Sequence, residues 1–207
     1  MRNPWLDIPL ADYEAHMALP TIGQSTMIAD ELGALISTYS PRSVAVIGCA
    51  GGNGFDRLLG AGVGRVAGID INPDYIAQAR RRYAGLIPGL ELHIADIQSC
   101  ASLFDPVDLI YIALVLEHVD PPRTMNVLRH HCKPGGALAV LSQLPHGTMT
   151  NVSPSPYASL KLLAPAMRLI SPEELQRLAQ QAGFSPAHSR VISSSGGKHF
   201  RVDEFRL

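Results

Sequence analysis

Short apolar runs alternate with amphipathic segments along most of the chain. The apolar runs predict buried strands at about 44–47, 64–70, 90–95, 107–113 and 137–141. Segments with helical spacing follow the glycines near residue 54, begin at Pro73, and run from 121 to about 132. Continuous apolar strands that alternate with helices are typical of a parallel sheet with right-handed crossovers and helices on both faces. We therefore predict an α/β fold with a doubly wound, mostly parallel sheet.

Capping residues indicate where several helices begin and end. Asn72 precedes a proline and an acid, which suits an N-cap followed by a favourable first turn. Asp120 precedes two prolines, and residues 133–136 (Lys-Pro-Gly-Gly) are expected to end that helix before the fifth strand. Ser171 begins a capping box for a last helix, which ends at Gly183.

The remaining segments have a looser pattern. Residues 1–40 predict a helical prelude with one helix at about 25–39, and residues 144–170 carry four prolines and little periodicity. Both can overhang the carboxyl ends of the strands, where doubly wound sheets bind ligands. We expect one domain over 1–207: a helical lid (1–40), a cofactor-binding core (41–143), an insertion or lid (144–170), and a helix with a β-hairpin (171–207). The hairpin strands are predicted at 187–193 and 198–206.

Composition narrows the classes of function. The chain has 207 residues, is 46% hydrophobic and carries a formal net charge of −1, whereas nucleic-acid binders usually present a basic patch, so no nucleic-acid partner is expected. Its longest uncharged apolar run, 109–116, is far shorter than the roughly 20 residues that cross a bilayer. Cys49, Cys100 and Cys132 lack disulfide or zinc spacing, and no signal segment is visible. We expect a cytoplasmic protein without membrane association.

A glycine-rich turn and two strand-end acids indicate a ligand site. The turn at 48–54 directly follows the first strand, and its glycines allow backbone N–H groups to approach a ligand closely. Asp70 closes the second strand, where a carboxylate can accept both hydroxyl protons of a ribose, and Asp96 follows the third strand. The turn fits Gly-x-Gly-x-x-Gly poorly, because Ala50 stands where that dinucleotide fingerprint requires glycine. This spacing favours a nucleoside cofactor without a pyrophosphate, and an NAD(P)-binding oxidoreductase is the alternative.

Together with the run at 108–119 and the Lys-Pro-Gly-Gly at 133–136, these residues resemble the class I S-adenosylmethionine-dependent methyltransferases. The resemblance covers roughly residues 43–143, and residues 3–5 and 12–17 resemble a bacterial branch of that family that implies no particular acceptor. It implies a Rossmann-like sheet of seven strands in the order 3-2-1-4-5-7-6, with S-adenosyl-L-methionine as cofactor. The residues that it places against this cofactor are Gly48, Cys49, Ala50, Gly52, Asp70, Ile71, Asp96, Ile97 and Ala113.

The resemblance implies methyl transfer, and the near-neutral charge favours a small-molecule acceptor. The oligomeric state is not indicated. Val46 departs from the family pattern. The family usually has an acid at this position, two residues before the first glycine of the turn, and that acid helps to hold the ammonium group of the cofactor. We expect loop carbonyl groups and a residue of the N-terminal segment to replace that acid. The departure leaves a non-catalytic S-adenosylmethionine-binding protein as a further alternative.

Catalytic candidates follow from position and chemistry. A general base matters only for an acceptor that must lose a proton, and His118, after the fourth strand, has the type of side chain that titrates near neutrality. The candidates for the substrate pocket are Tyr13, His16, Glu117 and Tyr157.

No metal site is expected. His130 and His131 are adjacent on a predicted helix and therefore face different directions, so we predict that both lie at the surface.

Overall fold

The computed structural model describes residues 3–99, 102–145 and 150–207, so Cys100 lies outside the described residues. Within these ranges one mixed sheet has seven strands in the order β3-β2-β1-β4-β5-β7-β6, which confirms the fold expected above. The strands are β1 (Ser43–Ile47), β2 (Arg65–Asp70), β3 (Leu90–Ile94), β4 (Val107–Ala113), β5 (Cys132–Gln143), β6 (Ser185–Ser193) and β7 (His199–Arg206).

The first five strands are parallel, and β7 pairs antiparallel with both β5 and β6. β1 lies inside the sheet, where Val44 pairs with Val66 of β2 on one side and with Leu109 of β4 on the other. All five residues of β1 are buried. A strand that is covered on both faces needs apolar side chains at successive positions, which is why the sequence shows continuous runs rather than alternation.

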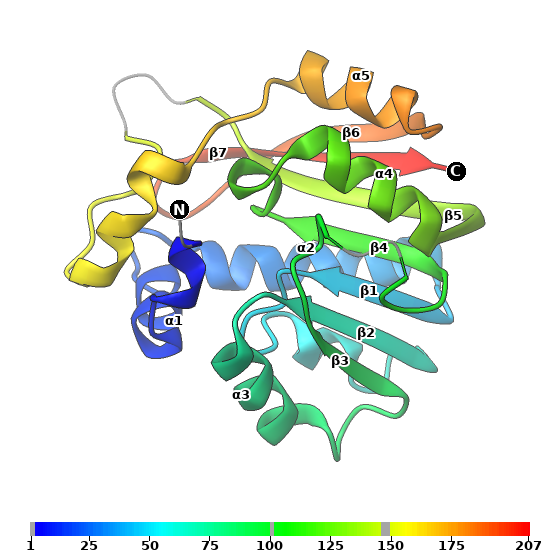
Figure 1. Ribbon diagram of the computed structural model, residues 1–207, viewed down its shortest axis with the longest axis horizontal. Helices are drawn as coiled ribbons and strands as arrows, with labels where there is room; N and C mark the ends of the chain where they lie inside the picture. Colours follow the sequence, from blue (N-terminus) through cyan, green and yellow to red (C-terminus); the bar gives the residue numbers. More distant parts are fainter. Residues whose placement is uncertain (1–2, 100–101, 146–149) are drawn as a thin grey trace.

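Helices cover both faces of the sheet (Figure 1). The α-helices of the described residues are α1 (Leu10–Met17), α2 (Gln24–Tyr39), α3 (Pro73–Tyr83), α4 (Pro121–His131) and α5 (Pro172–Gln181). The expected caps are confirmed: Asn72, Asp120 and Ser171 each accept a hydrogen bond from a backbone N–H in the first turn of α3, α4 and α5. Among the described helices, none has both the length and the apolar character needed to cross a bilayer.

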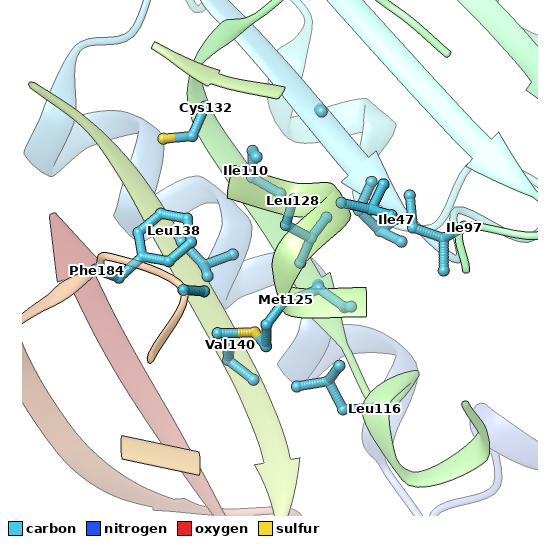
Figure 2. Packing of buried hydrophobic residues seen from close by; sticks show 14 of the residues in the cluster. Ile47, Ile97, Ile110, Leu116, Met125, Leu128, Cys132, Leu138, Val140 and Phe184 are labelled. Carbon is cyan, nitrogen blue, oxygen red and sulfur yellow. The ribbon is translucent and has the colours of Figure 1, made fainter. Parts of the chain in front are cut away.

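Two apolar layers hold the helices to the sheet. α2 packs on one face, where its fully buried Leu32 belongs to the same cluster as Val46 of β1. α4 and α5 pack on the other face, and Figure 2 shows Leu128 of α4 beside Ile110 and Leu138 of the sheet. Burial of one such aliphatic side chain contributes roughly 1.5–3 kcal/mol, so these layers fix the sheet edge on which the site stands.

The helical spacing after the glycine turn predicts a short helix, and the structure has the 3-10 helix Phe55–Leu58 there, which ends before the chain turns at Gly60 and Gly62 with positive φ. One expectation about local structure was wrong. The Lys-Pro-Gly-Gly run lies inside β5 rather than before it. The register of the β4–β5 pairing shifts at this run, since Val107 pairs with Cys132 but Leu109 pairs with Ala137. Within the irregular stretch Gly135 has a φ of +75°.

The prediction that His131 lies at the surface was also wrong, whereas His130 is exposed. His131 is 2% exposed, its Nδ1 lies 2.7 Å from the carbonyl oxygen of Phe104, and its ring stacks on the Phe104 ring with centroids 4.2 Å apart. The last turn of α4 packs onto the sheet at this point, so adjacent helix positions have opposite environments.

Three segments from distant parts of the chain meet at one end of the molecule. The short helices η1 (Pro4–Leu6) and α1 lie beside η4 (Ala158–Leu162), where Ile8, Leu160 and Leu163 form an apolar cluster. In Figure 1 these are the blue and yellow segments near the label N. The tip of the β6–β7 hairpin joins them, since Ser195 Oγ donates to the carbonyl oxygen of Pro20 at 3.0 Å.

Candidate functional site

A cavity opens at the carboxyl ends of β1, β2 and β4, with about 670 Å³ of empty space that is partly open to solvent. The first turn after each of these strands contributes to its wall, which is where doubly wound sheets bind ligands. Among its lining residues are Gly48, Ala50, Asp70, Ile71, Asp96, Ile97, Ala113, Tyr13 and His118.

The glycine turn forms one wall of this first cavity. The backbone N–H groups of Gly48 and Cys49 donate to the carbonyl oxygen of Ile69 at 2.8 and 3.0 Å, which ties the turn to the end of β2. Gly48 has a φ of +71°, and a Cβ on it would lie 2.3 Å from Cγ2 of Val115, so the close approach requires glycine. Ala50 adopts a φ of +47°, a strained conformation of the kind that collects at functional sites.

Asp70 is held by the backbone around the cavity. Its Oδ2 accepts from the N–H of Ala50 and its Oδ1 from the N–H of Asn72, both at 2.9 Å. Burial raises the pKa of the Asp70 carboxyl to about 6, and the backbone hydrogen bonds act in the opposite direction. Each oxygen keeps a second lone pair for a ligand hydroxyl, so the carboxylate can still accept two further hydrogen bonds. This is the geometry expected of a ribose-binding acid.

Asp96 follows β3 and lines the same cavity as the glycine turn. The Gln98 backbone and side chain both donate to Asp96 Oδ1 at 3.0 Å. These bonds fix the carboxylate in place at the cavity wall beside Ile97. A fixed acceptor next to an apolar residue suits an amino group on a flat heterocycle.

Aromatic residues of the N-terminal segment border the same cavity. The Trp5 ring makes edge contacts with Tyr13 and His118, with centroids 5.5 and 5.1 Å apart, and Tyr13 stacks near Tyr75 at 6.1 Å. Tyr75 is anchored by its hydroxyl, which donates to the carbonyl oxygen of Ile8 at 3.0 Å. The ring faces supply a surface that attracts cations.

A second cavity adjoins the first and has about 550 Å³ of empty space. The two share Trp5, Tyr13, Leu114 and His118 in their walls. Leu114, at the end of β4, has a φ of +57°, so a second strained residue lies at the boundary. The second cavity is bounded by the three segments that meet at this end of the molecule.

His118 lies at the boundary between the two cavities. Its Nδ1 is buried and has no hydrogen-bond partner among the described residues. Burial lowers the pKa of His118 to about 4, so the imidazole is neutral near pH 7. A neutral imidazole with a free nitrogen can orient a ligand or accept a proton, although at this pKa it is a weak base.

The polar residues of the second cavity are basic or neutral. Lys198 is 5% exposed, and its Nζ donates to the carbonyl oxygen of Asn151 and to Oε1 of Gln143, the latter at 3.4 Å. Burial lowers the pKa of Lys198 to about 8. His16 also lines this cavity; burial and then the Lys198 charge lower the pKa of His16, and its Nδ1 has no partner among the described residues.

Four of the predicted site residues do not line either of these cavities. Cys49 is buried beneath the turn, with its thiol 3.7 Å from the carbonyl oxygen of Ala50, and Gly52 faces a separate depression beside Glu14 and Arg82. Tyr157 packs against the apolar cluster of Ile8, Leu160 and Leu163.

Glu117, the fourth, is buried behind the cavities. Its Oε1 accepts from the backbone N–H of Gln143 at 2.9 Å, and burial raises the pKa of Glu117 to about 7. This contact ties η3 (Leu116–His118) to the end of β5 and so helps to position His118.

Sequence reasoning did not single out Trp5, Tyr75, Gln143 or Lys198 as site residues. Trp5 is the chain's single tryptophan and lies near a lid-like segment, which was a usable signal. Lys198 follows a glycine pair in a predicted hairpin and carried no signal, because its burial depends on contacts made by distant segments. Within the described residues, no group of three or more His, Cys, Asp or Glu side chains is arranged to hold a metal ion.

A cavity with a backbone-held acid at the end of β2, on a sheet that ends in an antiparallel pair, defines a cofactor-binding protein of the methyltransferase fold. The family described as "Methyltransferase domain" matches residues 44–136. The chain belongs to the class I S-adenosylmethionine-dependent methyltransferases, and S-adenosylmethionine is the methyl donor of this family.

Curated relatives are similar over part of their length. Trans-aconitate 2-methyltransferase of Methylobacterium nodulans is 30% identical over 166 residues, which cover 76% of this chain and 62% of that protein. A tRNA U34 carboxymethyltransferase of a Shewanella species is 31% identical over 140 residues, which cover 66% of this chain and 41% of that protein. The chain thus spans less than two thirds of the length of these relatives.

A solved structure shows the same fold. The magnesium protoporphyrin IX methyltransferase of Synechocystis, solved with bound S-adenosylhomocysteine, superposes with a TM-score of 0.68. The superposition covers 90% of this chain and 84% of that chain at 16% sequence identity. At this identity the likeness concerns the architecture of the sheet and its helices.

Proposed function

We propose that this protein transfers a methyl group from S-adenosylmethionine to a small-molecule acceptor. The observation that carries the proposal is the pair of adjoining cavities. The first has a backbone-held Asp70 at the end of β2, and the second meets it at His118. One cavity is suited to the donor and the other to the acceptor.

The residues of the first cavity fit the donor. Asp70 would accept from the ribose hydroxyl groups, and Asp96 with Ile97 would border the adenine. At Gly48 a side chain would fill the space, since its Cβ would collide with Val115. When bound, S-adenosylmethionine supplies an activated methyl group on a sulfonium centre.

The missing acid at Val46 has a candidate replacement. Val46 is 4% exposed and packs under α2, so it does not contribute to ligand binding. The rings of Trp5 and Tyr13, both from the N-terminal segment, line the first cavity and can attract the cofactor's positive charges. This supports the expectation that residues 1–40 complete the donor site.

The chemistry left to the protein is mainly alignment. Holding two reactants in position can lower a barrier by about 7–11 kcal/mol. His118 would orient the acceptor at the boundary of the cavities. Because its pKa is about 4, it is better suited to an acceptor group that is already ionised than to a hydroxyl that must lose its proton.

Two observations favour a small molecule over a nucleic acid. The second cavity is partly enclosed by segments far apart in sequence, and the chain has a formal net charge of −1. The relative from Methylobacterium nodulans is a trans-aconitate methyltransferase, so trans-aconitate is the first acceptor to assay.

Binding and turnover separate the candidate functions. Trp5 borders both cavities, so its fluorescence can follow titration with S-adenosylmethionine, S-adenosylhomocysteine and NADH. We expect binding of the first two at micromolar concentration. Absence of binding at millimolar concentration would refute the proposal, and tight NADH binding would favour an oxidoreductase, against which the antiparallel β7 counts.

Turnover is measured with S-adenosylmethionine that carries an isotope-labelled methyl group, mixed with trans-aconitate or a fractionated metabolite extract. We expect label in a low-molecular-weight product. Tight donor binding with no labelled product in any fraction would instead support the non-catalytic alternative.

A further inference from the structure

A buried cation stands in the second cavity without an anionic partner. Lys198 precedes β7, lines the cavity and is 5% exposed, and its Nζ bonds to Gln143 and Asn151, which line the same cavity. An ammonium group has three hydrogen-bond donors. The described residues provide two acceptors, the carbonyl oxygen of Asn151 and, at 3.4 Å, Oε1 of Gln143, and both are uncharged.

The rest of the cavity wall lacks negative charge. Among the described residues that line it, none is Asp or Glu; the polar ones include His16, Gln24, His118 and Gln143. Removal of a lysine ammonium from water costs several kcal/mol unless a counter-charge is supplied. The ion pairs of the described residues lie elsewhere, so a ligand is the natural source of that charge.

A second polar atom in the same wall also lacks a partner. His16 is 6% exposed, and its Nδ1 makes no hydrogen bond with the described residues. An unpaired buried polar atom costs roughly 1–3 kcal/mol. A ligand oxygen that accepts hydrogen bonds would satisfy the Lys198 ammonium. It would also satisfy His16 in the neutral tautomer that carries its proton on Nδ1.

The position of Lys198 is held by the fold. The backbone N–H of Ser194 donates to the carbonyl oxygen of Lys198 at 3.0 Å, and the hairpin tip is anchored by Ser195 on Pro20. Because the strand and the tip fix the backbone, the side chain is directed into the cavity rather than to solvent. The fold therefore holds the Lys198 ammonium group at the second cavity.

We propose that Lys198 binds a carboxylate or phosphate group of the methyl acceptor, so that the substrate of this enzyme is a small anionic molecule. The inference rests on the proposed function, because it treats the second cavity as the acceptor site. The acceptor's anionic group would lie at Lys198 and its reacting atom toward His118, where the two cavities meet.

Binding to the protein saturated with S-adenosylhomocysteine tests this directly. The probes are pairs of similar shape in which a neutral amide replaces each carboxylate, namely succinate with succinamide, glutarate with glutaramide, and benzoate with benzamide. Inorganic phosphate is tested as well. Trp5 fluorescence and calorimetry report binding. We expect at least one carboxylate, or phosphate, to bind at least about tenfold more tightly than the neutral probes, as for a charge-assisted hydrogen bond.

The variant Lys198→Met removes the charge and keeps an unbranched side chain. We expect it to abolish the preference for the charged probe while its affinity for S-adenosylhomocysteine stays unchanged. Lys161→Met is the matched control, because Lys161 is an exposed lysine of η4 that lines neither cavity; it should behave as wild type. The ranking of carboxylates against phosphate identifies which anion the site takes.

The outcomes distinguish this inference from the proposed function. If S-adenosylhomocysteine does not bind, the proposed function fails. If it binds but the wild-type protein prefers no charged probe over the neutral ones, the inference about Lys198 is wrong whether or not the variant folds. A folded Lys198→Met protein that keeps the preference would overturn it as well.

Discussion

The pH dependence of cofactor binding follows from the burial of Asp70. This carboxyl is 9% exposed and has a pKa of about 6, so it takes up a proton under mildly acidic conditions. Only the ionised form presents acceptors alone to ribose hydroxyl groups. We therefore predict that affinity for S-adenosylhomocysteine rises with pH through about pH 6, and that Asp70→Asn removes this dependence.

The magnitude follows from the fraction ionised. With a pKa of about 6, about 9% of the Asp70 carboxyls are ionised at about pH 5 and about 91% at about pH 7. If the ligand binds the ionised form, its apparent Kd falls about tenfold between these two pH values. The Asp70→Asn protein loses the charge-assisted hydrogen bonds and should bind roughly 10–100-fold more weakly at about pH 7.

Trp5 fluorescence at a series of pH values measures this Kd. S-adenosylhomocysteine suits the assay because none of its groups changes charge between about pH 5 and about pH 7. Glu117→Gln is the control variant, since Glu117 is also a buried acid with a raised pKa but lines neither cavity. It should keep the tenfold change.

Two results would refute the reasoning. One is a wild-type Kd that is constant from about pH 5 to about pH 7. The other is an Asp70→Asn protein, shown to be folded by its circular dichroism, that keeps the full pH dependence.

Three further predictions concern stability. Leu128→Ala, at a fully buried position of α4, should lower the free energy of unfolding by about 2–5 kcal/mol in urea titrations. Gly196→Ala should lower the thermal midpoint, because a Cβ there would lie 2.0 Å from the carbonyl oxygen of Thr21 and push the hairpin tip away. The pKa of Glu117 is about 7 in the folded protein, above its unfolded value, so this group makes the protein less stable as pH rises. The variant Glu117→Gln still accepts a hydrogen bond from Gln143 but does not titrate. It should reduce the fall in the free energy of unfolding between about pH 5 and about pH 7 by about 2 kcal/mol.

Matched comparisons make these predictions decisive. Leu86→Ala, at a position that is 60% exposed, should change stability little, and an equal loss in both leucine variants would contradict the core assignment. Gly197→Ala lies beside Gly196 but its Cβ meets nothing within 4 Å, so it should cost only the strain of its positive φ. An unchanged pH slope in Glu117→Gln would show that this acid is not the titrating group.

The parallel sheet and the acids of the donor cavity were accessible from sequence because they depend on local patterns, whereas the order of the seven strands came from the family resemblance. Apolar runs, caps and glycines identify the strand ends in chain order, and parallel strands bring their carboxyl ends to one edge. Asp70 and Asp96 could therefore be placed together without coordinates. The register skip in β5 was missed, because Gly135 signals a turn equally well when it lies inside a bulge.

The second cavity could not be predicted in the same way. Its wall combines His16, Gln143 and Lys198 from three separated segments, and no spacing in the chain indicates that they meet. Burial of Lys198 depends on the hairpin tip docking near Pro20. His131 shows the same limit, since a residue in a polar-looking helix end proved to be buried against Phe104.

Each of the two cavities contains a buried charged group without a counter-charge among the described residues, and this has an energetic consequence. Arg190, on the far strand pair, is matched by Glu204 and Glu31, so its charge is compensated within the fold. Asp70 and Lys198 have neutral hydrogen-bond partners only, and the raised pKa of Asp70 alone costs the free protein about 3 kcal/mol at neutral pH. A ligand that supplies the missing partner stabilises the folded state by mass action. Donor and acceptor should therefore each raise the thermal midpoint. With both bound, the rise should exceed the sum of the two separate rises, because His118 and the aromatic wall at the shared boundary are then ordered only once.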